Sequence, residues 1–373
     1  MSNRPDKPNK HDTTQWRETP WLALKGFLMG AADIVPGVSG GTMALITGIY
    51  DRLICAVRSV DLPLIRTLLR FDLAGFFDRF HWRFLLILLS GIGIAVLFFT
   101  RVVPLQVYMH THPELIFGLF FGLILGSALF LLREINGQKT FRSVWGPLMV
   151  GAAIGLLIVS LVPAATPESP IFLLLTGMIA FCAMILPGIS GSYFLVLLGK
   201  YDYILGLLGT LEPNTVLSTS LTLFPFFLGG ALGLGLFSRL LSWLLDRYHT
   251  ATLALLIGFL FGTLVQIWPW QERQYETRIT ESTWLHVEDP RIQELLEEGP
   301  RSSLPEYTRL AEPQTIQGDS LQVQTVKQTL VQSDPYLPVQ DRSIAETGLL
   351  PGIGGMLAGL FLVSGLERLR HKQ

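Results

Sequence analysis

Two copies of a Pro-Gly-x-Ser-Gly motif place helix-breaking residues and hydroxyl groups inside apolar segments, at 36–40 and 187–191. Proline and glycine interrupt a helix, so backbone N–H groups at the break lack intrahelical acceptors. The helix that follows also directs the positive end of its dipole toward the break. Such breaks can bind phosphate or carboxylate; a kink at a tight helix crossing is the structural alternative. The predicted anion-binding residues are Ser39, Gly40, Gly41, Thr42, Ser190, Gly191 and Ser192.

Charged residues near the breaks are candidates for coupling or gating. Asp33 lies three residues before Pro36 inside an apolar segment, where a charge is costly and usually functional. It could accept a proton, couple a cation or pair with an arginine, and a cap at the water boundary is the alternative. Arg52 and Lys200 come just after the two segments. We predict that they guide anions toward the two entrances.

Two further arginines and two tyrosines occupy matching positions in the chain. We expect Arg101 and Arg239 to lie at helix ends, where each guanidinium could bind a phosphate through two hydrogen bonds. Simple extension of the two side chains toward lipid head groups is an equally good explanation. The pairs Tyr50-Asp51 and Tyr201-Asp202 are predicted to anchor the ends of the two motif segments at the membrane interface.

Other chemistries fit the sequence less well. The run Gly37-Val38-Ser39-Gly40-Gly41 matches G-x-S-x-G, but that nucleophile turn requires a preceding strand. An intramembrane serine protease needs a histidine within a later helix, whereas the seven histidines lie in tails, loops or segment ends. No Walker A motif is present, and two cysteines exclude a disulfide framework or cysteine-based metal site. We predict no enzymatic activity, no metal, no cofactor and no nucleic-acid partner.

The composition indicates a membrane protein, because 50% of residues are hydrophobic and only 15% are charged. The chain begins with a polar tail, which we interpret as a cytoplasmic segment and not as a signal peptide. Several segments without Asp, Glu, Lys or Arg approach or exceed the roughly 20 residues that cross a bilayer. They are 84–100, 115–132, 143–167, 169–199, 213–238, 250–270 and 347–366.

The chain contains an internal repeat. Residues 35–51 align with 186–202 without a gap and share seven identities in seventeen positions. The match returns near the C-terminus at an offset of 204 residues instead of 151, which locates an insertion at 271–343 in the second copy. The insert holds 13 acidic and 7 basic residues.

The positive charges in short loops predict the topology, because Lys and Arg accumulate on the cytoplasmic side. Segment 169–199 is too long for one upright crossing and is broken in its middle, so a re-entrant helical hairpin is the economical interpretation. With both motif segments re-entrant, each repeat has three crossings, and the two repeats have opposite orientations. Inverted repeats with broken helices are typical of secondary transporters.

The predicted fold is therefore an all-α polytopic membrane protein made of two inverted-topology repeats, each with a re-entrant hairpin and three transmembrane helices. The predicted segments are a cytoplasmic tail at 1–20, repeat one at 21–163 with its hairpin at 22–50, repeat two at 171–366 with its hairpin at 171–199, a small extracytoplasmic insert at 271–343, and a cytoplasmic tail at 367–373.

Two local patterns add detail. Apolar and basic residues alternate with helical spacing over 51–83, which predicts an amphipathic helix on anionic lipid. The glycine pairs Gly151/Gly155 and Gly355/Gly359 predict close contacts between helices.

The sequences GAADIVPGVSGGTMALITGIYDRLI at 30–54 and MILPGISGSYFLVLLGKYD at 184–202 resemble the bacterial polyprenyl-phosphate transporter family, formerly a family of unknown function. The resemblance covers nearly all of the chain except the N-terminal tail and the insert. It implies a translocase that returns undecaprenyl phosphate from the outer to the inner leaflet of the bacterial inner membrane, for reuse in cell-envelope synthesis.

The residues themselves lead only to an anion-binding transporter, and the resemblance supplies the lipid. Expected partners are a polyprenyl phosphate, membrane lipids and a coupling H⁺ or Na⁺. A secondary transporter of a small soluble anion and an intramembrane serine protease remain as alternatives.

Overall fold

The structure is a computed structural model that describes residues 14–35, 38–60, 62–103, 105–136, 141–161, 166–209, 216–297, 299, 306–311, 316–317, 319–338 and 348–370. The chain divides into two bodies. The first comprises 1–102, 122–267 and 359–373, and the second comprises 103–121 and 268–358. Pro36 and Gly37 of the first motif lie outside the described residues.

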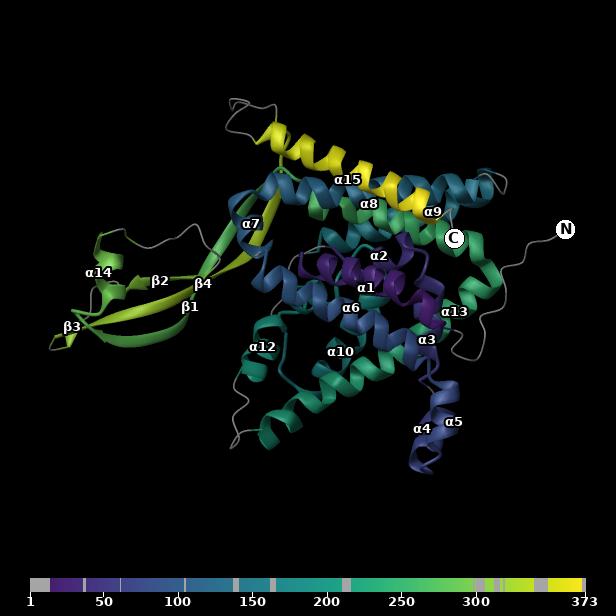
Figure 1. Ribbon diagram of the computed structural model, residues 1–373, viewed down its shortest axis with the longest axis horizontal. Coiled ribbons are helices and arrows are strands. Elements are labelled where there is room, and N and C mark those ends of the chain that lie inside the picture. Colours follow the sequence, from purple (N-terminus) through teal and green to yellow (C-terminus); the bar gives the residue numbers. More distant parts are fainter. Residues whose placement is uncertain are drawn as a thin grey trace. The chain divides into compact units, whose positions relative to one another are not determined.

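The described part of the first body is helical (Figure 1). Two helices, α8 (Pro113–Asn136) and α15 (Leu349–Arg370), have residues in both bodies. The other α-helices of the first body are α1 (Thr19–Ile34), α2 (Gly40–Ile46), α3 (Tyr50–Arg58), α4 (Leu62–Leu69), α5 (Leu73–Arg79), α6 (Trp82–Arg101), α9 (Phe141–Val159), α10 (Pro170–Ile185), α11 (Gly191–Leu197), α12 (Tyr201–Gly209) and α13 (Val216–Thr263). Short 3-10 turns lie at Trp16–Glu18 and Leu264–Ile267.

Both motif segments form a longer helix, a break and a seven-residue helix. Ser39 caps α2 by accepting a hydrogen bond from the Gly41 amide, and Ser190 caps α11 by accepting one from Tyr193. The short helices end before Gly48 and Gly199, whose φ angles of 72° and 60° are ones that glycine adopts without strain. We refer to α1 with α2 as the first helix pair, and to α10 with α11 as the second.

Each helix pair packs against a long helix through glycines at equivalent positions. Figure 1 shows α1 alongside α6, and α10 packs in the same way against α13. A Cβ atom at Gly26 would lie 2.4 Å from the carbonyl oxygen of Leu88. At Gly177, 151 residues later, it would lie 2.0 Å from that of Phe226. Only glycine permits these two close backbone approaches.

The predicted close helix contacts are present at Gly151, Gly155 and Gly355. Added Cβ atoms at Gly151 and Gly155 of α9 would lie 2.0 and 2.6 Å from the carbonyls of Leu255 and Phe259 on α13. Gly355 of α15 approaches the Leu115 carbonyl of α8 in the same way, at 2.3 Å. These contacts confirm the prediction of tight helix packing at the three glycines.

Three helical segments are long and apolar enough to cross a membrane, namely 82–101, 113–133 and 216–267. Shorter apolar helices occupy 144–159, 170–185 and 349–365. Within α13 the backbone leaves the helical conformation at Tyr248, with φ −130° and ψ 43°, so two helices meet there. Arg239 lies inside α13, nine residues before this kink, and the prediction that it ends a helix is wrong.

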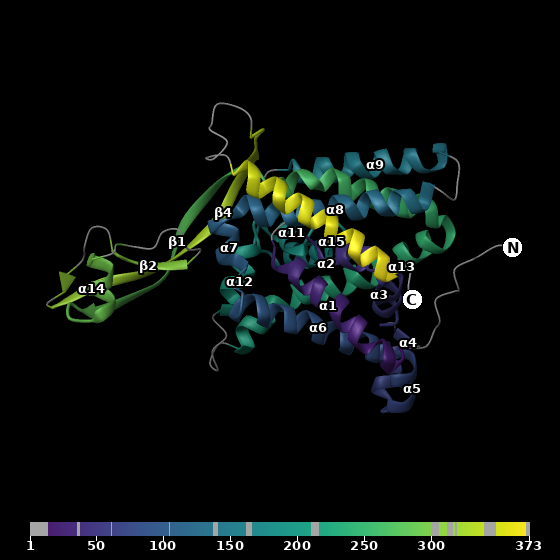
Figure 2. The same ribbon diagram turned by 45° about the horizontal axis from the view of Figure 1, so that its top comes forward.

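The second body contains a β-sheet, although the sequence predicts an all-α fold. Its elements are α7 (Leu105–Thr111), β1 (Gln271–His286), α14 (Pro290–Glu297), β2 (Glu306–Leu310), β3 (Ile316–Gln317) and β4 (Ser320–Pro335). The strand order is β1-β4-β2, and β3 also pairs with β4. β1 and β4 run antiparallel over their full lengths as a long ribbon (Figures 1 and 2). The all-α prediction therefore does not extend to the segment predicted as the insert.

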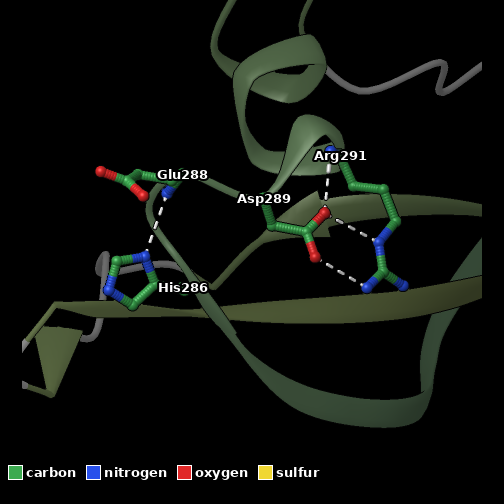
Figure 3. A network of polar contacts seen from close by, with 4 residues as sticks. All are labelled: His286, Glu288, Asp289 and Arg291. Atoms are coloured by element: carbon green, nitrogen blue, oxygen red, sulfur yellow. Dashed lines mark hydrogen bonds and ion pairs between the residues drawn. The ribbon is translucent and has the colours of Figure 1, made fainter.

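A small core joins α14 to the sheet. Ile292 of α14 packs with Leu321 and Val323 of β4, and all three side chains are buried. Before α14 begins, both carboxylate oxygens of Asp289 accept hydrogen bonds from the Arg291 guanidinium, at 3.0 and 2.9 Å (Figure 3). These bonds hold the pKa of the Asp289 carboxyl below its usual range.

Candidate functional site

The two helix breaks meet in the interior of the first body. The hydroxyl of Ser39 donates to the carbonyl of Leu186 at 3.2 Å, and the amide of Gly188 donates to the hydroxyl oxygen of Thr42 at 2.8 Å. Ser39 and Thr42 are 1% and 0% exposed. Hydroxyl groups of the first motif therefore complete the hydrogen bonding of the second break.

A tyrosine at the end of the first segment makes a third contact of this kind. Tyr50 is 2% exposed, and its hydroxyl donates to the carbonyl of Ile185 at 3.1 Å. Ile185 is the last residue of α10, where carbonyl groups have no partner within the helix. The prediction that Tyr50 anchors the segment at the membrane interface is wrong, because its hydroxyl satisfies a buried helix end.

The second break requires glycine at position 188. The φ angle of Gly188 is 101°, which side chains rarely tolerate, and an added Cβ would lie 2.6 Å from the hydroxyl oxygen of Thr263. Thr263 belongs to the end of α13 and donates to the Leu260 carbonyl. The break is thus enclosed by the first helix pair and by α13.

The amides at the start of α2 already have partners within the chain. The Gly40 amide donates to a carboxylate oxygen of Asp33 at 2.6 Å, and the Gly41 amide donates to the Ser39 hydroxyl oxygen at 3.1 Å. The Thr42 amide donates to the Ser39 carbonyl at 2.9 Å. The carboxylate of Asp33 therefore occupies the position at the α2 N-terminus that an external anion would take.

The second break leaves hydroxyl groups more accessible. Ser192 is exposed and Ser190 is half-buried, and their hydroxyl oxygens lie 2.6 Å apart. Ser190 also accepts the Tyr193 amide at 3.3 Å. Gly191 is buried, and a Cβ there would lie 2.6 Å from the Ala180 carbonyl. Among the predicted anion-binding residues, Ser192 of the second break is thus the exposed one with a hydroxyl group, whereas Ser39 and Thr42 of the first break are buried.

The basic residue that follows each helix pair bonds to the chain that precedes it. The Arg52 guanidinium lies 3.1 Å from the Glu18 carboxylate and donates to the Thr14 hydroxyl at 3.0 Å. The Lys200 ammonium is 2% exposed and donates to the carbonyl of Thr166 at 2.7 Å. In each helix pair, the chain just after the second helix is therefore bonded to the chain just before the first helix.

The two predicted phosphate-binding arginines lie on exposed surface. Arg101 ends α6 and makes no hydrogen bond or ion pair with another described residue. The Arg239 guanidinium donates to the Gly235 carbonyl one turn earlier at 2.9 Å. Neither guanidinium bonds to a described motif residue.

A further charged residue of α1 was not predicted from the sequence. Lys25 lies in α1 two turns before Asp33 and is half-buried. Its signal was available, because a basic residue inside an apolar helix is as unusual as an acidic one.

Comparisons with known proteins agree on one family. A family described as undecaprenyl phosphate translocase-like matches residues 29–284. A polyprenyl-phosphate transporter of Vibrio cholerae serotype O1 is 43% identical over 249 residues, which cover 67% of this chain and 77% of the relative. A polyprenyl-phosphate transporter of Staphylococcus aureus is 31% identical over 269 residues, which cover 67% of this chain and 86% of that protein. The family and both relatives are described as transporters and not as enzymes, as the sequence analysis predicted for this chain. No solved structure matches the chain.

Proposed function

The chain belongs to the undecaprenyl phosphate translocase-like family, and we propose that it is a multi-pass membrane transporter of polyprenyl phosphate. In this proposal it carries undecaprenyl phosphate from the outer to the inner leaflet of the bacterial inner membrane, where the carrier lipid is reused for cell-envelope synthesis. Both termini lie in the cytoplasm and the insert lies outside.

The observation that carries the mechanism is the meeting of the two breaks through Ser39, Thr42 and Tyr50. A transporter of inverted repeats binds its substrate where two broken helices meet near the middle of the membrane. Because Arg52 and Lys200 join the end of each helix pair to its beginning, each pair can enter and leave the membrane on one side. These bonds and the equivalent glycine contacts of α1 and α10 support two re-entrant hairpins in inverted repeats.

We propose that the phosphate binds one break at a time. In the conformation described, the hydroxyls of Ser190 and Ser192 with the amides at the start of α11 form the accessible site. Ser39, Gly40, Gly41 and Thr42 form the second site after Asp33 leaves the Gly40 amide. Protonation of Asp33, or its pairing with Na⁺, would release this amide and couple ion binding to transport.

The exchange between the two sites follows from the repeat. Ser190 and Tyr201 correspond to Ser39 and Tyr50 at an offset of 151 residues. In the opposite state, the hydroxyl of Ser190 would donate to the carbonyl of Val35 and that of Tyr201 to the carbonyl of Ile34. Arg101 and Arg239 then serve as capture sites for the phosphate head group on the lipid-facing surface, while the polyprenyl tail stays in lipid.

Transport by the purified full chain in liposomes tests the proposal. Undecaprenyl phosphate is placed in both leaflets, and an added phosphatase reports the fraction that reaches the outer leaflet over time. We expect rapid exchange with the protein and slow exchange without it. The double variant Ser190→Ala with Ser192→Ala should be slowed at least about tenfold, the effect of losing ~1.4 kcal/mol of phosphate binding. Ser160→Ala is the matched control, because the Ser160 hydroxyl donates only to the Leu156 carbonyl of its own helix.

Two results would contradict parts of this assignment. If the protein exchanged inorganic phosphate across the liposome membrane but not the lipid, its substrate would be a small soluble anion and not a polyprenyl phosphate. Full lipid transport by both Arg101→Ala and Arg239→Ala would show that the two arginines do not bind the phosphate head group during transport.

A further inference from the structure

The connection between α4 and α5 exposes an apolar surface. Figures 1 and 2 show the two helices as a pair next to α3. Five large apolar side chains of this pair are exposed. We call them the apolar tip: Leu68, Leu69, Phe71, Leu73 and Phe77, which are 47, 73, 88, 57 and 49% exposed.

Phe71 at the centre of the apolar tip has a backbone conformation that favours glycine. Its φ angle is 57°, and it is the non-glycine residue with a positive φ among those that the structure describes. It follows the end of α4, where the Asp72 amide donates to the Thr67 carbonyl at 3.2 Å. Helices commonly place glycine at this position. A bulky apolar residue that is strained and almost fully exposed gains nothing from the fold, so its side chain needs a contact outside the chain.

The apolar tip is tied to the start of a membrane-spanning helix. α5 ends at Arg79, three residues before α6 begins at Trp82. The rings of Phe77 and Trp82 also contact each other, with centroids 5.6 Å apart. Three residues span at most about 10 Å, and tryptophan at the end of a spanning helix usually lies at head-group depth. The apolar tip therefore cannot leave the region of the membrane surface.

The charges around the apolar tip identify the class of lipid. Arg66 and Arg79 are exposed on the two helices, and Arg70 is exposed in the turn between them. The exposed carboxylate of Asp72 is used within the chain, where it accepts the Gly75 amide at 3.0 Å and caps α5. Exposed apolar groups flanked by arginines are the pattern of a helix that lies in an anionic lipid surface.

We propose that the apolar tip inserts into the acyl boundary of one leaflet, and that Arg66, Arg70 and Arg79 bind the head groups of anionic phospholipids there. This interaction surface is separate from the proposed transport site. It fixes the position of the chain that joins the first helix pair to α6, and it does not require that the cargo be a polyprenyl phosphate.

Spin-label accessibility in the full-length protein tests the insertion. Cys55 and Cys182 are free thiols, so both are first replaced by serine. Nitroxide labels are then placed by Phe71→Cys, by Leu97→Cys on the exposed face of α6 and by Gln293→Cys on α14, in nanodiscs of phosphatidylcholine with phosphatidylglycerol. We expect the label at 71 to resemble that at 97, accessible to oxygen and protected from a water-soluble nickel complex.

Two outcomes of this measurement would overturn the proposal. Accessibility to nickel equal to that at position 293 would mean that the tip lies in water. Protection from both reagents would mean that a second copy of the chain, and not lipid, covers it. The head-group contact is tested by repeating the measurement with Arg66→Gln and Arg70→Gln combined. We expect the protection to fall in mixed nanodiscs and to stay unchanged in phosphatidylcholine alone. A variant that is as well protected in mixed nanodiscs as the protein with both arginines would refute the anionic-lipid assignment.

The variant Phe71→Gly separates lipid insertion from a structural role. Glycine relieves the positive φ, so we expect the midpoint of thermal unfolding in detergent to stay equal or rise. We also expect a label at Leu73→Cys to become several-fold more accessible to nickel in nanodiscs. A lower midpoint with unchanged accessibility at 73 would show that Phe71 packs within the protein and would contradict the proposal.

Discussion

The amide of Gly188 donates to the hydroxyl oxygen of Thr42 at 2.8 Å, across 146 residues of chain. The two residues belong to different copies of the repeated segment, 35–51 and 186–202, and both are buried. The bond therefore joins the copies at their breaks, where neither has a complete set of backbone hydrogen bonds. The packing of the two helix pairs against each other therefore depends on the hydroxyl group of Thr42, which a side chain of the same shape with a methyl group in its place could not supply.

Replacement of Thr42 by valine should destabilise the protein. Valine keeps the shape of threonine but leaves the buried Gly188 amide without an acceptor, which costs about 1–3 kcal/mol. Thermal unfolding in detergent should show a lower midpoint, and Thr42→Ser should restore most of it. Thr47→Val is the matched control, because the Thr47 hydroxyl donates to the Met43 carbonyl within its own segment. Equal effects of the two valine variants would contradict a special role for the contact between the breaks.

Replacement of Gly151 by alanine should weaken the packing of α9 on α13. The new Cβ would lie 2.0 Å from the Leu255 carbonyl oxygen, so the helices must separate. Overpacking of this kind costs about 1–3 kcal/mol. Gly93→Ala in the middle of α6 is the control, since a Cβ there would meet no atom of another segment within 4 Å. The control should be neutral or stabilising by about 0.5–1 kcal/mol because alanine favours the helix. Thermal unfolding of both variants in one detergent measures the difference.

Loss of the ammonium group of Lys200 should have a larger effect than loss of the Arg52 guanidinium. Lys200 is buried, bonds to the Thr166 carbonyl and has its charge 5.6 Å from the ring centre of Tyr203. A hydrogen bond from a charged group contributes about 1.5–3 kcal/mol. The Arg52–Glu18 pair is 42 and 44% exposed, and such pairs contribute about 0–1 kcal/mol. The midpoint of thermal unfolding should therefore fall further for Lys200→Met than for Arg52→Met. A larger fall for Arg52→Met would contradict the argument, because it would mean that the exposed ion pair contributes more stability than the buried hydrogen bond.

The duplicated motif could predict where the helices break but not what the breaks contact. The paired Pro-Gly residues predicted the interruption between α10 and α11, and the shared glycines Gly48 and Gly199 mark the ends of the short helices. Tyr50 was assigned to the interface, because a tyrosine near a segment end resembles an anchor. Its actual partner, Ile185, is 135 residues away, and no local pattern identifies such a partner.

The insert shows a second limit of the sequence. β1 and β4 pair over sixteen residues each, but about thirty residues separate them and both carry exposed polar side chains on long stretches. Alternation of apolar and polar residues is weak where neither sheet face is widely buried, so the strands gave no clear signal. Arg239 illustrates the same problem for helices, since composition did not reveal that α13 continues past it to Tyr248.

Asp33 provides the most direct test of ion coupling, because its charge and its hydrogen bond can be removed separately. Asp33→Asn keeps an oxygen that accepts the Gly40 amide but removes the negative charge, so we expect a stable protein whose transport rate no longer varies with pH. Asp33→Ala removes both and should also lower the unfolding midpoint. Asp72→Asn is the control, since Asp72 caps the separate helix α5 through the Gly75 amide in the same way. Initial rates of lipid exchange in liposomes, measured at several pH values and with Na⁺ or K⁺, give the comparison. A pH profile of Asp33→Asn that matches the unsubstituted protein would show that Asp33 acts only as the cap of α2.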